Sequence, residues 1–468
     1  MPEFDPDTLA AWTGGRWSRR PEAAPVGFSA DSRRILRGQV FVALKTARRD
    51  GHDFLGDAQK AGAAAAFVSR ENPAVAVPQL VVAEPLKALQ AVAREHRKAF
   101  RGTVVGITGS AGKTSTKELL ALLLGGEASG VLATEGNLNN HIGVALTLCR
   151  LDPGRHRLAV VEAGISAPGE MRSLAGMIAP DIVVVTLVGP AHLAELGGLE
   201  GVASEKAVLA ASVRAGGVCI FPSSCGAYGA FRKLPVSGRI VVEPAANLGT
   251  GAPAAGQVPF VVAHSANYTT VTVGYGQPPP VVATLQRVTD GMAQNAALAI
   301  CAALRIGVGQ DEIQKRLLSW RASPLRGEWR RSEGRRLYLD CYNANPASMA
   351  DALAAFDAVA PHAEPRLLVI GCMEELGPDA ERYHVELGRS LKLRRGDQLI
   401  AIGSLAGAIR KGALEAGGDP DQIEIADEIG PLSSRLAAFR GSVFVKGSRR
   451  HQLEKAFSGA EFAEASHA

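Results

Sequence analysis

The sequence predicts an α/β protein of three domains, and three observations support this prediction. The chain has 468 residues, which at roughly 150 residues per domain corresponds to about three domains. Short apolar runs alternate with helical segments, as they do where parallel strands are joined by helices. A glycine-rich loop follows one apolar run and opens a leucine-rich helix, which is typical of a mononucleotide-binding unit.

The domains are expected to span residues 1–98, 99–318 and 319–468. In the first domain, apolar runs predict strands at 40–44 and 64–68, and periodic apolar residues predict a helix at 85–100. Together these elements indicate a small α/β unit.

The central domain is predicted to be a parallel sheet around the glycine-rich loop, because its strands are near-continuous apolar runs. The predicted strands are 103–108, 158–161 and 181–185, and the predicted helices are 113–124 and 291–306. The stretch 238–280 is rich in Val, Thr, Gly and Pro and predicts antiparallel β-structure.

The C-terminal domain is predicted to be a doubly wound, Rossmann-like sheet. Its strands are expected at 337–339, 367–370, 399–402 and 443–445, with helices between them. No G-x-G-x-x-G segment is present, so a dinucleotide is not indicated. Ligands are expected at the carboxyl ends of the strands.

Composition narrows the function classes. The net charge of +5 is a mild excess without a long basic tract, and it suits a pyrophosphate-bearing small molecule as well as a nucleic acid. Six scattered cysteines, most of them inside apolar runs, are expected to be reduced core residues. The acidic N-terminus has no signal-peptide h-region, and no apolar run reaches the roughly 18 residues of a membrane span. We therefore expect a soluble, cytoplasmic protein.

The glycine-rich loop is the strongest functional signal. Its backbone N–H groups are expected to face nucleotide phosphates, with Lys113 reaching the β- and γ-phosphates and Thr114 offering its hydroxyl to Mg²⁺. The pattern G-x-x-x-x-G-K-[ST] is not met, because Ile107 stands at its first glycine. The loop residues are Thr108, Gly109, Ser110, Ala111, Gly112, Lys113, Thr114 and Ser115.

Polar residues follow two other strands of the same predicted sheet. Glu162, after strand 158–161, is either a Mg²⁺ ligand or a helix cap, and the nearby loop favours the ligand. His192, beyond strand 181–185, is as consistent with a structural hydrogen bond as with a site residue. Lys206 lies in a helical stretch, and its spacing alone indicates an ordinary solvated lysine.

The outer domains contain weaker signals. Asp340 ends a predicted strand before Cys-Tyr-Asn-Ala-Asn-Pro, which is either a structured turn or part of a site. The segment 446–449, Lys-Gly-Ser-Arg, follows another strand and is either an anion-binding loop or a solvated one. Asp31-Ser32-Arg33 is by itself a weak signal.

Taken together, these segments resemble the Mur ligases over nearly the whole chain. The resemblance rests on T-G-S-A-G-K-T-S at 108–115, T-E-G-N-L-N-N-H-I-G at 134–143, D-C-Y-N-A-N-P-A-S-M at 340–349, G-C-M-E-E-L-G at 371–377 and K-G-S-R at 446–449. The Y-N-A-N-P and K-G-S-R segments are the specific ones, whereas the loop is shared with all Mur ligases and with folylpolyglutamate synthases.

The resemblance implies an ATP-dependent ligase that joins D-alanyl-D-alanine to UDP-N-acetylmuramoyl-tripeptide through an acyl phosphate, as a cytoplasmic monomer in peptidoglycan synthesis. It implies no nucleic acid or membrane partner, and it leaves the third peptide residue, lysine or diaminopimelate, open. Two alternatives remain: a ligase that adds a single amino acid or glutamate, which Y-N-A-N-P disfavours, and a non-catalytic nucleotide-binding scaffold, which the retained Lys113 and Glu162 disfavour.

The resemblance also implies residue roles. Lys113, Glu162, His192 and Lys206 are expected to be catalytic. Two Mg²⁺ ions are expected at Thr114, Glu162, His192 and Lys206, with Lys206 carbamylated. ATP is expected to contact the loop together with Asn295, Arg326 and Asp340. The other substrates are expected at Ser32, Arg33, Asn137, Asn139, Asn140, Tyr342, Asn343 and Asn345.

Six positions depart from the family pattern without removing a proposed metal ligand. They are Ala145 for Pro, Leu187 for Asn, Ala194 for Glu, Gly291-Met292 for His-Asn, and Leu339 for Asp.

Overall fold

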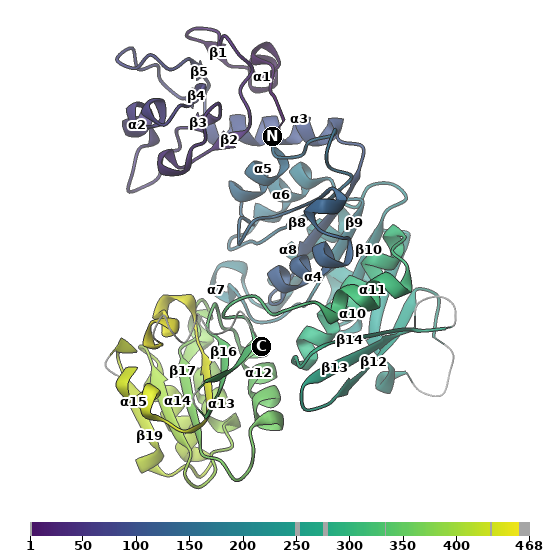
Figure 1. Ribbon diagram of the computed structural model, residues 1–468, viewed down its shortest axis with the longest axis vertical. Coiled ribbons are helices and arrows are strands. Elements are labelled where there is room, and N and C mark those ends of the chain that lie inside the picture. Colours follow the sequence, from purple (N-terminus) through teal and green to yellow (C-terminus); the bar gives the residue numbers. More distant parts are fainter. Residues whose placement is uncertain (1, 249–252, 275–278, 333, 431–432, 458–468) are drawn as a thin grey trace.

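The computed structural model describes residues 2–248, 253–274, 279–332, 334–430 and 433–457. Within these residues the chain forms three units, each built on its own β-sheet. Figure 1 shows them in a row, with the N-terminal unit at one end, the central unit in the middle and the C-terminal unit at the other end. This arrangement confirms the predicted α/β architecture.

The N-terminal unit is a small five-stranded sheet, and its predicted strands and helix are confirmed within a few residues. The strand order is β1 (Arg16–Trp17), β5 (Gln79–Val81), β4 (Ala65–Val68), β3 (Val40–Val42) and β2 (Phe28–Ser29). Its helices are α1 (Pro6–Thr13), α2 (Leu55–Lys60) and α3 (Pro85–Ala99).

Helix α3 also belongs to the packing of the central unit. Its buried Arg97 donates through Nε to the Ile178 carbonyl at 2.9 Å and pairs with Asp181 at 3.1 Å. The side chain of Gln90 donates to the His141 carbonyl at 3.2 Å. One hydrophobic cluster therefore runs from the N-terminal sheet through α3 into the central unit.

The central unit is a nine-stranded sheet with the glycine-rich loop at the end of an inner strand. Its order is β14 (Val281–Gln286), β13 (Tyr268–Val273), β12 (Gln257–His264), β11 (Gly238–Pro244), β10 (Val218–Pro222), β9 (Ile182–Val185), β6 (Thr103–Thr108), β8 (Leu158–Glu162) and β7 (Val131–Ala133). Strand β6 is parallel to both β8 and β9, so the carboxyl ends of these three strands meet at one edge. Ligands of such sheets bind at this kind of edge.

The prediction of antiparallel structure across 238–280 was wrong in its first part. Strands β10, β11 and β12 pair in parallel and extend the main sheet, and only β12, β13 and β14 pair antiparallel. The Val- and Thr-rich composition favours strands of either direction, so direction depended on tertiary pairing. Residues 249–252 and 275–278 of this stretch lie outside the described residues.

Helices cover both faces of the central sheet. They are α4 (Lys113–Leu123), α5 (Gly143–Leu148), α6 (Glu170–Ile178), α7 (Leu193–Leu196), α8 (Leu199–Ala211), α9 (Gly229–Arg232), α10 (Asp290–Ile306) and α11 (Gln310–Leu318). The alanine-rich α10 is buried beside α4 from Asn295 to Ala303, which explains the apolar composition of this segment.

The C-terminal unit confirms the predicted layered sheet. Its order is β15 (Glu328–Ser332), β16 (Arg335–Asp340), β20 (Gly441–Lys446), β17 (Arg366–Gly371), β18 (Gln398–Ile402) and β19 (Ile423–Ala426), all parallel except β15 against β16. Helices α12 (Pro346–Val359), α13 (Ala380–Ser390), α14 (Ala406–Glu415) and α15 (Ser433–Ala438) connect the parallel strands. Separate hydrophobic clusters cover the two faces.

Two expectations from composition can be compared with the fold. All six cysteines are free and buried, as their positions in apolar runs predicted. Among the residues described, no helix combines the length and apolar character needed to cross a membrane.

Candidate functional site

The glycine-rich loop is held by backbone contacts with the end of β9. The amide of Ser110 donates to the Leu187 carbonyl at 2.8 Å, and the Thr186 amide donates to the Thr108 carbonyl at 2.9 Å. Gly109 has φ +152°, and a Cβ there would lie 1.8 Å from the Thr186 hydroxyl oxygen. Only glycine therefore permits this close approach between loop and strand.

The second loop glycine places the loop against α10. Gly112 has φ +76°, and a Cβ there would lie 2.3 Å from Asn295 Nδ2. Asn295 is thus packed on the loop backbone at the start of α4. Lys113, the first residue of α4, donates from Nζ to the Gly109 carbonyl at 2.8 Å. Burial lowers the pKa of Lys113, while the charge of Glu162 opposes this shift.

Glu162 is a buried carboxylate at the end of β8. Its Oε1 accepts hydrogen bonds from Asn139 Nδ2 at 2.7 Å and from the Thr114 hydroxyl at 3.2 Å. Within the described part of the chain, the buried Oε2 has no hydrogen-bond partner. Native structures rarely leave such an atom unsatisfied, so this oxygen suits a bound cation beside Thr114.

His192 contacts the C-terminal unit. Its Nδ1 lies 2.7 Å from Oε2 of Glu375, and the Leu193 amide donates to the Glu375 carbonyl at 3.1 Å. His192 and Glu375 both have positive φ, at 53° and 62°. The neighbouring His192 imidazole lowers the pKa of Glu375, against the rise that burial causes. The imidazole therefore lies at the joint between two units, and Glu375 is a residue of this edge to which sequence reasoning assigned no role.

Lys206 is buried, so the solvated lysine that its spacing indicated was wrong. Its side chain lies in α8 with only 3% of the residue exposed. Burial lowers the pKa of Lys206 well below its usual value, and the charge of Lys113 lowers it further. Among the described residues Lys206 forms no ion pair, and the negative charge of its neighbour Glu205 only opposes the shift. Spacing concealed this environment because a lysine in a helix is usually exposed, whereas Lys206 lies on the buried face of α8 with Val202 and Ala210.

The buried Lys446 of β20 pairs with the partly buried Asp340 of β16. Lys446 Nζ donates to Asp340 Oδ2 and also to the Asn343 carbonyl at 3.3 Å. Burial raises the pKa of Asp340, whereas Lys446 lowers it. Lys446 is therefore neither a solvated loop residue nor, in this arrangement, a free anion-binding group. It orders the loop after Asp340.

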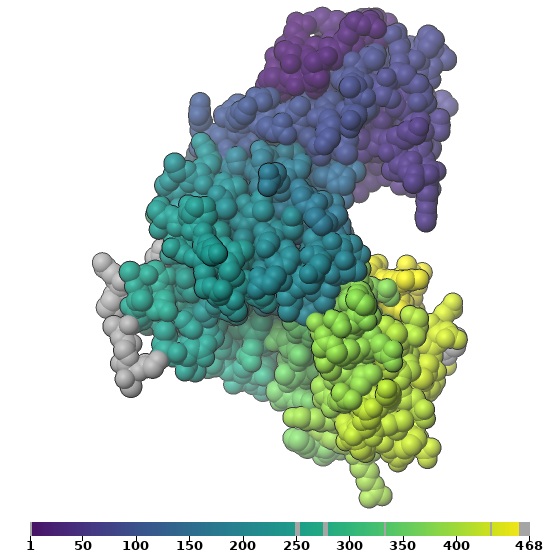
Figure 2. Space-filling view, turned by 180° about the vertical axis from the view of Figure 1, so that it is seen from behind, coloured from purple at the N-terminus to yellow at the C-terminus, as the bar shows by residue number. Residues whose placement is uncertain are grey.

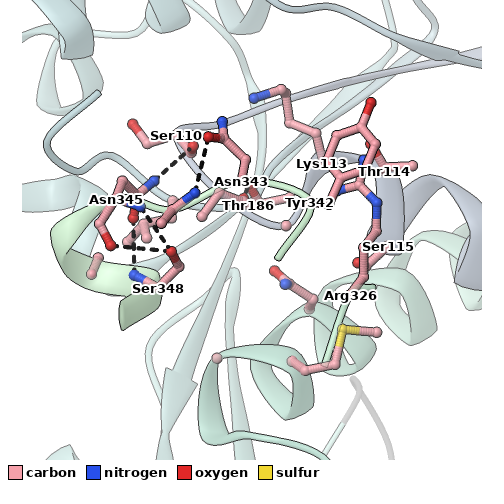
Figure 3. Close-up of a pocket in the computed structure, with 18 of the residues that line it drawn as sticks. Ser110, Lys113, Thr114, Ser115, Thr186, Arg326, Tyr342, Asn343, Asn345 and Ser348 are labelled. Carbon is pink, nitrogen blue, oxygen red and sulfur yellow. Dashed lines mark hydrogen bonds between the residues drawn. The ribbon is translucent and has the colours of Figure 1, made fainter. Parts of the chain in front are cut away.

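That loop docks on the glycine-rich loop. Asn345 caps α12 in a capping box with Ser348, and its Nδ2 donates to the Ser110 carbonyl at 3.2 Å. The guanidinium of Arg326 lies 3.7 Å from the centre of the Tyr342 ring, a cation–π contact. Figure 3 shows residues of both loops around one pocket, with Asn345 pointing at Ser110 and Arg326 on the opposite side.

These contacts enclose a cavity of about 630 Å³ between the central and C-terminal units. Many of the site residues predicted from the sequence line this cavity. They are Ser110, Ala111, Gly112, Lys113, Thr114, Ser115, Asn137, Asn139, Asn140, Glu162, His192, Asn295, Arg326, Asp340, Tyr342, Asn343 and Asn345. The volume suits a nucleotide, since small-molecule sites commonly enclose about 300–1,000 Å³.

Several predicted residues lie elsewhere. Ser32 and Arg33 belong to the N-terminal unit, which lies at the far side of the central unit from the C-terminal unit (Figure 2). Arg33 is exposed and pairs with Asp31 at 2.8 Å. Lys206 is close to Lys113 but does not line the cavity. Conversely, the lining includes Asp351 of α12, which sequence reasoning missed because an acidic residue inside a helix has no distinguishing local signal.

Comparison with known proteins agrees with this geometry. Three family models match: "Mur ligase family, catalytic domain" at residues 26–97, "Mur ligase middle domain" at 107–242, and "Mur ligase, glutamate ligase domain" at 325–449. A UDP-N-acetylmuramoyl-tripeptide–D-alanyl-D-alanine ligase of Bacillus subtilis is 31% identical, covering 83% of this chain and 82% of its own. The chain belongs to the Mur ligase family. It is a ligase. The Escherichia coli protein of the same name as the Bacillus subtilis relative is also 31% identical, and the match covers 91% of this chain and 92% of its own.

Solved structures are similar to this Mur ligase over its whole length. MurF from Acinetobacter baumannii has a TM-score of 0.83 at 26% identity and covers 97% of this chain and 98% of its own. MurF from Thermotoga maritima in complex with ADP has a TM-score of 0.77 at 26% identity, covering 92% of this chain and 96% of its own. The three-unit arrangement is therefore shared with these ligases.

Two departures from the family pattern have a structural account in this Mur ligase. Leu187 contributes its backbone carbonyl to the loop, a role that any residue can fill. Ala194 lies against Gly377 of the C-terminal unit, where a Cβ on the glycine would come within 3.1 Å of Ala194. This close approach disfavours a side chain at position 377, whereas Ala194 itself is exposed.

Proposed function

We propose that this ligase joins the terminal carboxylate of UDP-N-acetylmuramoyl-tripeptide to the amine of D-alanyl-D-alanine at the expense of ATP. The observation that supports this most directly is the shared cavity, in which the loop around Lys113 faces the segment 340–346 of another unit. The names of the relatives in Bacillus subtilis and Escherichia coli point to the same reaction. The ADP complex of the Thermotoga maritima relative supports ATP as the nucleotide.

The reaction proceeds in two steps. A carboxylate oxygen of the tripeptide attacks the γ-phosphorus of ATP, and ADP leaves with the bonding electron pair, which produces an acyl phosphate. The neutral amine of D-alanyl-D-alanine then attacks the acyl carbon, loses a proton, and inorganic phosphate leaves. Lys113 and the loop amides hold the phosphates, while Arg326 approaches them from the C-terminal unit. Because these groups come from two units, positioning accounts for much of the catalysis.

Mg²⁺ fits the residues present at the loop. Thr114, Glu162, His192 and a carbamylated Lys206 would hold two ions, and these would neutralise phosphate charge during transfer. The unsatisfied Oε2 of Glu162 beside the Thr114 hydroxyl supports this assignment.

Glu162→Gln is expected to raise the Mg²⁺ concentration at half-maximal activity by at least about 10- to 100-fold, which is the cost of losing even a partner of a metal ligand. The measurement is a Mg²⁺ titration of product formation. Glu135→Gln, at an exposed carboxylate of the same unit, is the control. An unchanged Mg²⁺ dependence in Glu162→Gln would contradict the assignment.

The remaining site roles follow from the same proposal. Asn295 and Asp340 contact the adenosine part of ATP. The uridine diphosphate lies near Ser32 and Arg33, and the muramoyl peptide follows Asn137, Asn139 and Asn140 toward the cavity. The enzyme works as a cytoplasmic monomer, with domain boundaries near 98/99 and 318/319.

Phosphate release is expected to require ATP, the UDP-tripeptide and D-alanyl-D-alanine together. The test measures inorganic phosphate and the amide product by mass spectrometry, omitting each substrate in turn. Replacing D-alanyl-D-alanine with single amino acids or glutamate is expected to abolish the product. Tripeptides ending in lysine and in diaminopimelate are compared in parallel, which identifies the preferred third residue.

Each other outcome has a defined meaning. Product with a single amino acid would move the chain to another ligase of the family. Nucleotide binding without phosphate release under any substrate combination would support a non-catalytic scaffold and overturn the proposal.

A further inference from the structure

Asp351 joins the C-terminal unit to the central unit beside the cavity. It lies in α12, and its Oδ1 accepts a hydrogen bond from the Gly291 amide at 3.0 Å in the first turn of α10. Burial raises the pKa of this carboxylate, and the neighbouring Thr289 side chain opposes the rise. Asp351 therefore reaches from one unit to the helix terminus of another.

The first turn of α10 needs this partner. The first N–H groups of a helix have no acceptor within the helix. Thr289 caps α10 and accepts from the Met292 amide at 3.1 Å, which leaves the Gly291 amide for Asp351. A carboxylate is also favoured at a helix N-terminus by the helix dipole. Asp351 thus completes the cap of a helix in a different unit.

Gly291 matches Asp351 sterically. A Cβ at position 291 would lie 2.5 Å from Asp351 Oδ2 and 3.1 Å from its Cγ. Within a helix, alanine is more stable than glycine, and no positive φ requires glycine at this position. The local preference of α10 is therefore for a side chain, whereas a side chain at position 291 would have to displace the Asp351 carboxylate.

The two helices that meet at this contact both reach the glycine-rich loop. Helix α10 carries Asn295 against Gly112, and Asn345, the N-cap of α12, donates to the Ser110 carbonyl. The contact between Asp351 and Gly291 joins these helices a short distance from the loop. The glycine-rich loop, α10 and α12 therefore each contact the other two along one side of the cavity.

We propose that Asp351 is a positioning residue that fastens α12 to the first turn of α10 and thereby sets how the C-terminal unit docks over the nucleotide. The nucleotide part of this inference rests on the proposed function, whereas the contact between the units does not. The pair Gly291–Asp351 accounts for the glycine that departs from the family pattern.

The test compares Asp351→Ala, Asp351→Asn, Gly291→Ala and the double variant Gly291→Ala/Asp351→Ala in the full chain. Dissociation of ADP·Mg²⁺ is measured by calorimetry and the KM for ATP by product formation. Asp351→Ala is expected to raise both the Kd for ADP·Mg²⁺ and the KM for ATP about tenfold, which is the effect of losing a hydrogen bond to a charged group. Asp351→Asn keeps the Oδ1 acceptor and is expected to stay within about threefold of the parent chain.

The double variant separates the specific contact from general damage. Gly291→Ala alone is expected to weaken ADP binding about as much as Asp351→Ala, because its methyl group displaces the carboxylate. In the double variant the clash is removed, so ADP binding is expected to equal that of Asp351→Ala, with a higher melting temperature from the alanine in α10. If the double variant weakened ADP binding by the product of the two single effects, the proposal would be overturned.

The control is Asp290→Asn, which removes a neighbouring exposed carboxylate that pairs with His264 within the central unit. It is expected to leave ADP binding within about twofold of the parent chain, because an exposed ion pair contributes little. Unchanged ADP binding in Asp351→Ala would overturn the proposal. ADP binding needs neither amino nor muramoyl substrate, so a chain that binds ADP and forms no product would contradict the proposed function alone.

Discussion

Replacing Lys113 with alanine is expected to lower kcat for the ligation by about 10²–10³-fold, the usual cost of removing one group that stabilises transition-state charge. Lys113 is the first residue of α4, and its ammonium donates a hydrogen bond to the Gly109 carbonyl at 2.8 Å. Charge builds up on the phosphoryl group during transfer, and no other described lysine lines the loop side of the cavity. The measurement is steady-state product formation at saturating ATP.

The stability of the same variant distinguishes lost chemistry from lost structure. Burial lowers the pKa of Lys113, so the folded chain binds this proton less readily than the unfolded chain does. At neutral pH, below the unfolded pKa, the ammonium therefore disfavours folding. Lys113→Ala is expected to melt at the same or a higher temperature. Lys315→Ala, at an exposed lysine of α11, is the activity control, and activity retained in Lys113→Ala would refute the assignment.

Lys206→Ala is expected to abolish turnover, to less than about one part in a hundred of the parent rate, since it removes a support for the metal. The neutral amine of a lysine adds to CO₂ and releases a proton, which leaves a negatively charged carbamate. Burial lowers the pKa of Lys206 well below its usual value, so the neutral amine is more available at a given pH. The negative charge of the carbamate on Lys206 would also remove the repulsion between the two lysines, Lys206 and Lys113.

Small carboxylic acids provide the discriminating measurement. Formate or acetate added to Lys206→Ala is expected to restore part of the activity, because a carboxylate can occupy the place of the carbamate. The same acids are expected to have no effect on Lys113→Ala. A carbonyl signal from ¹³CO₂ in the parent chain, absent in Lys206→Ala, would support the modification directly. Full activity in Lys206→Ala would exclude a carbamate role.

The predicted fold was largely confirmed because its signals are local. Strand 103–108 and helix 85–100 are contiguous apolar or periodic segments whose patterns come from the residues themselves. The failure at 238–280 concerned strand direction, since side-chain preferences do not distinguish parallel from antiparallel neighbours in a mixed sheet. Strands β15 and β19 lie at the two edges of their sheet. They were missed because their segments, Glu-Trp-Arg-Arg-Ser and Ile-Glu-Ile-Ala, lack the continuous apolar run of an inner parallel strand.

The residues of the candidate site also differ in whether a local pattern reveals them. Residues of the loop and Glu162 could be found because each follows a recognisable strand of one sheet. Lys206 could not be found from spacing, because its chemistry depends on burial, and burial depends on how α8 packs. Glu375 contacts His192, 183 residues away in the chain, and Asp351 contacts Gly291, 60 residues away. No local pattern encodes such separations.

By itself, the sequence determined the three α/β units, the loop that accepts a nucleotide and the segments that resemble Mur ligases. These depend on interactions between residues that are near in the chain. The tertiary structure alone decided how the C-terminal unit docks, which side chains it brings to the cavity, and which charges are buried there. The physical reason is that solvation and contacts between units arise only when distant segments pack together.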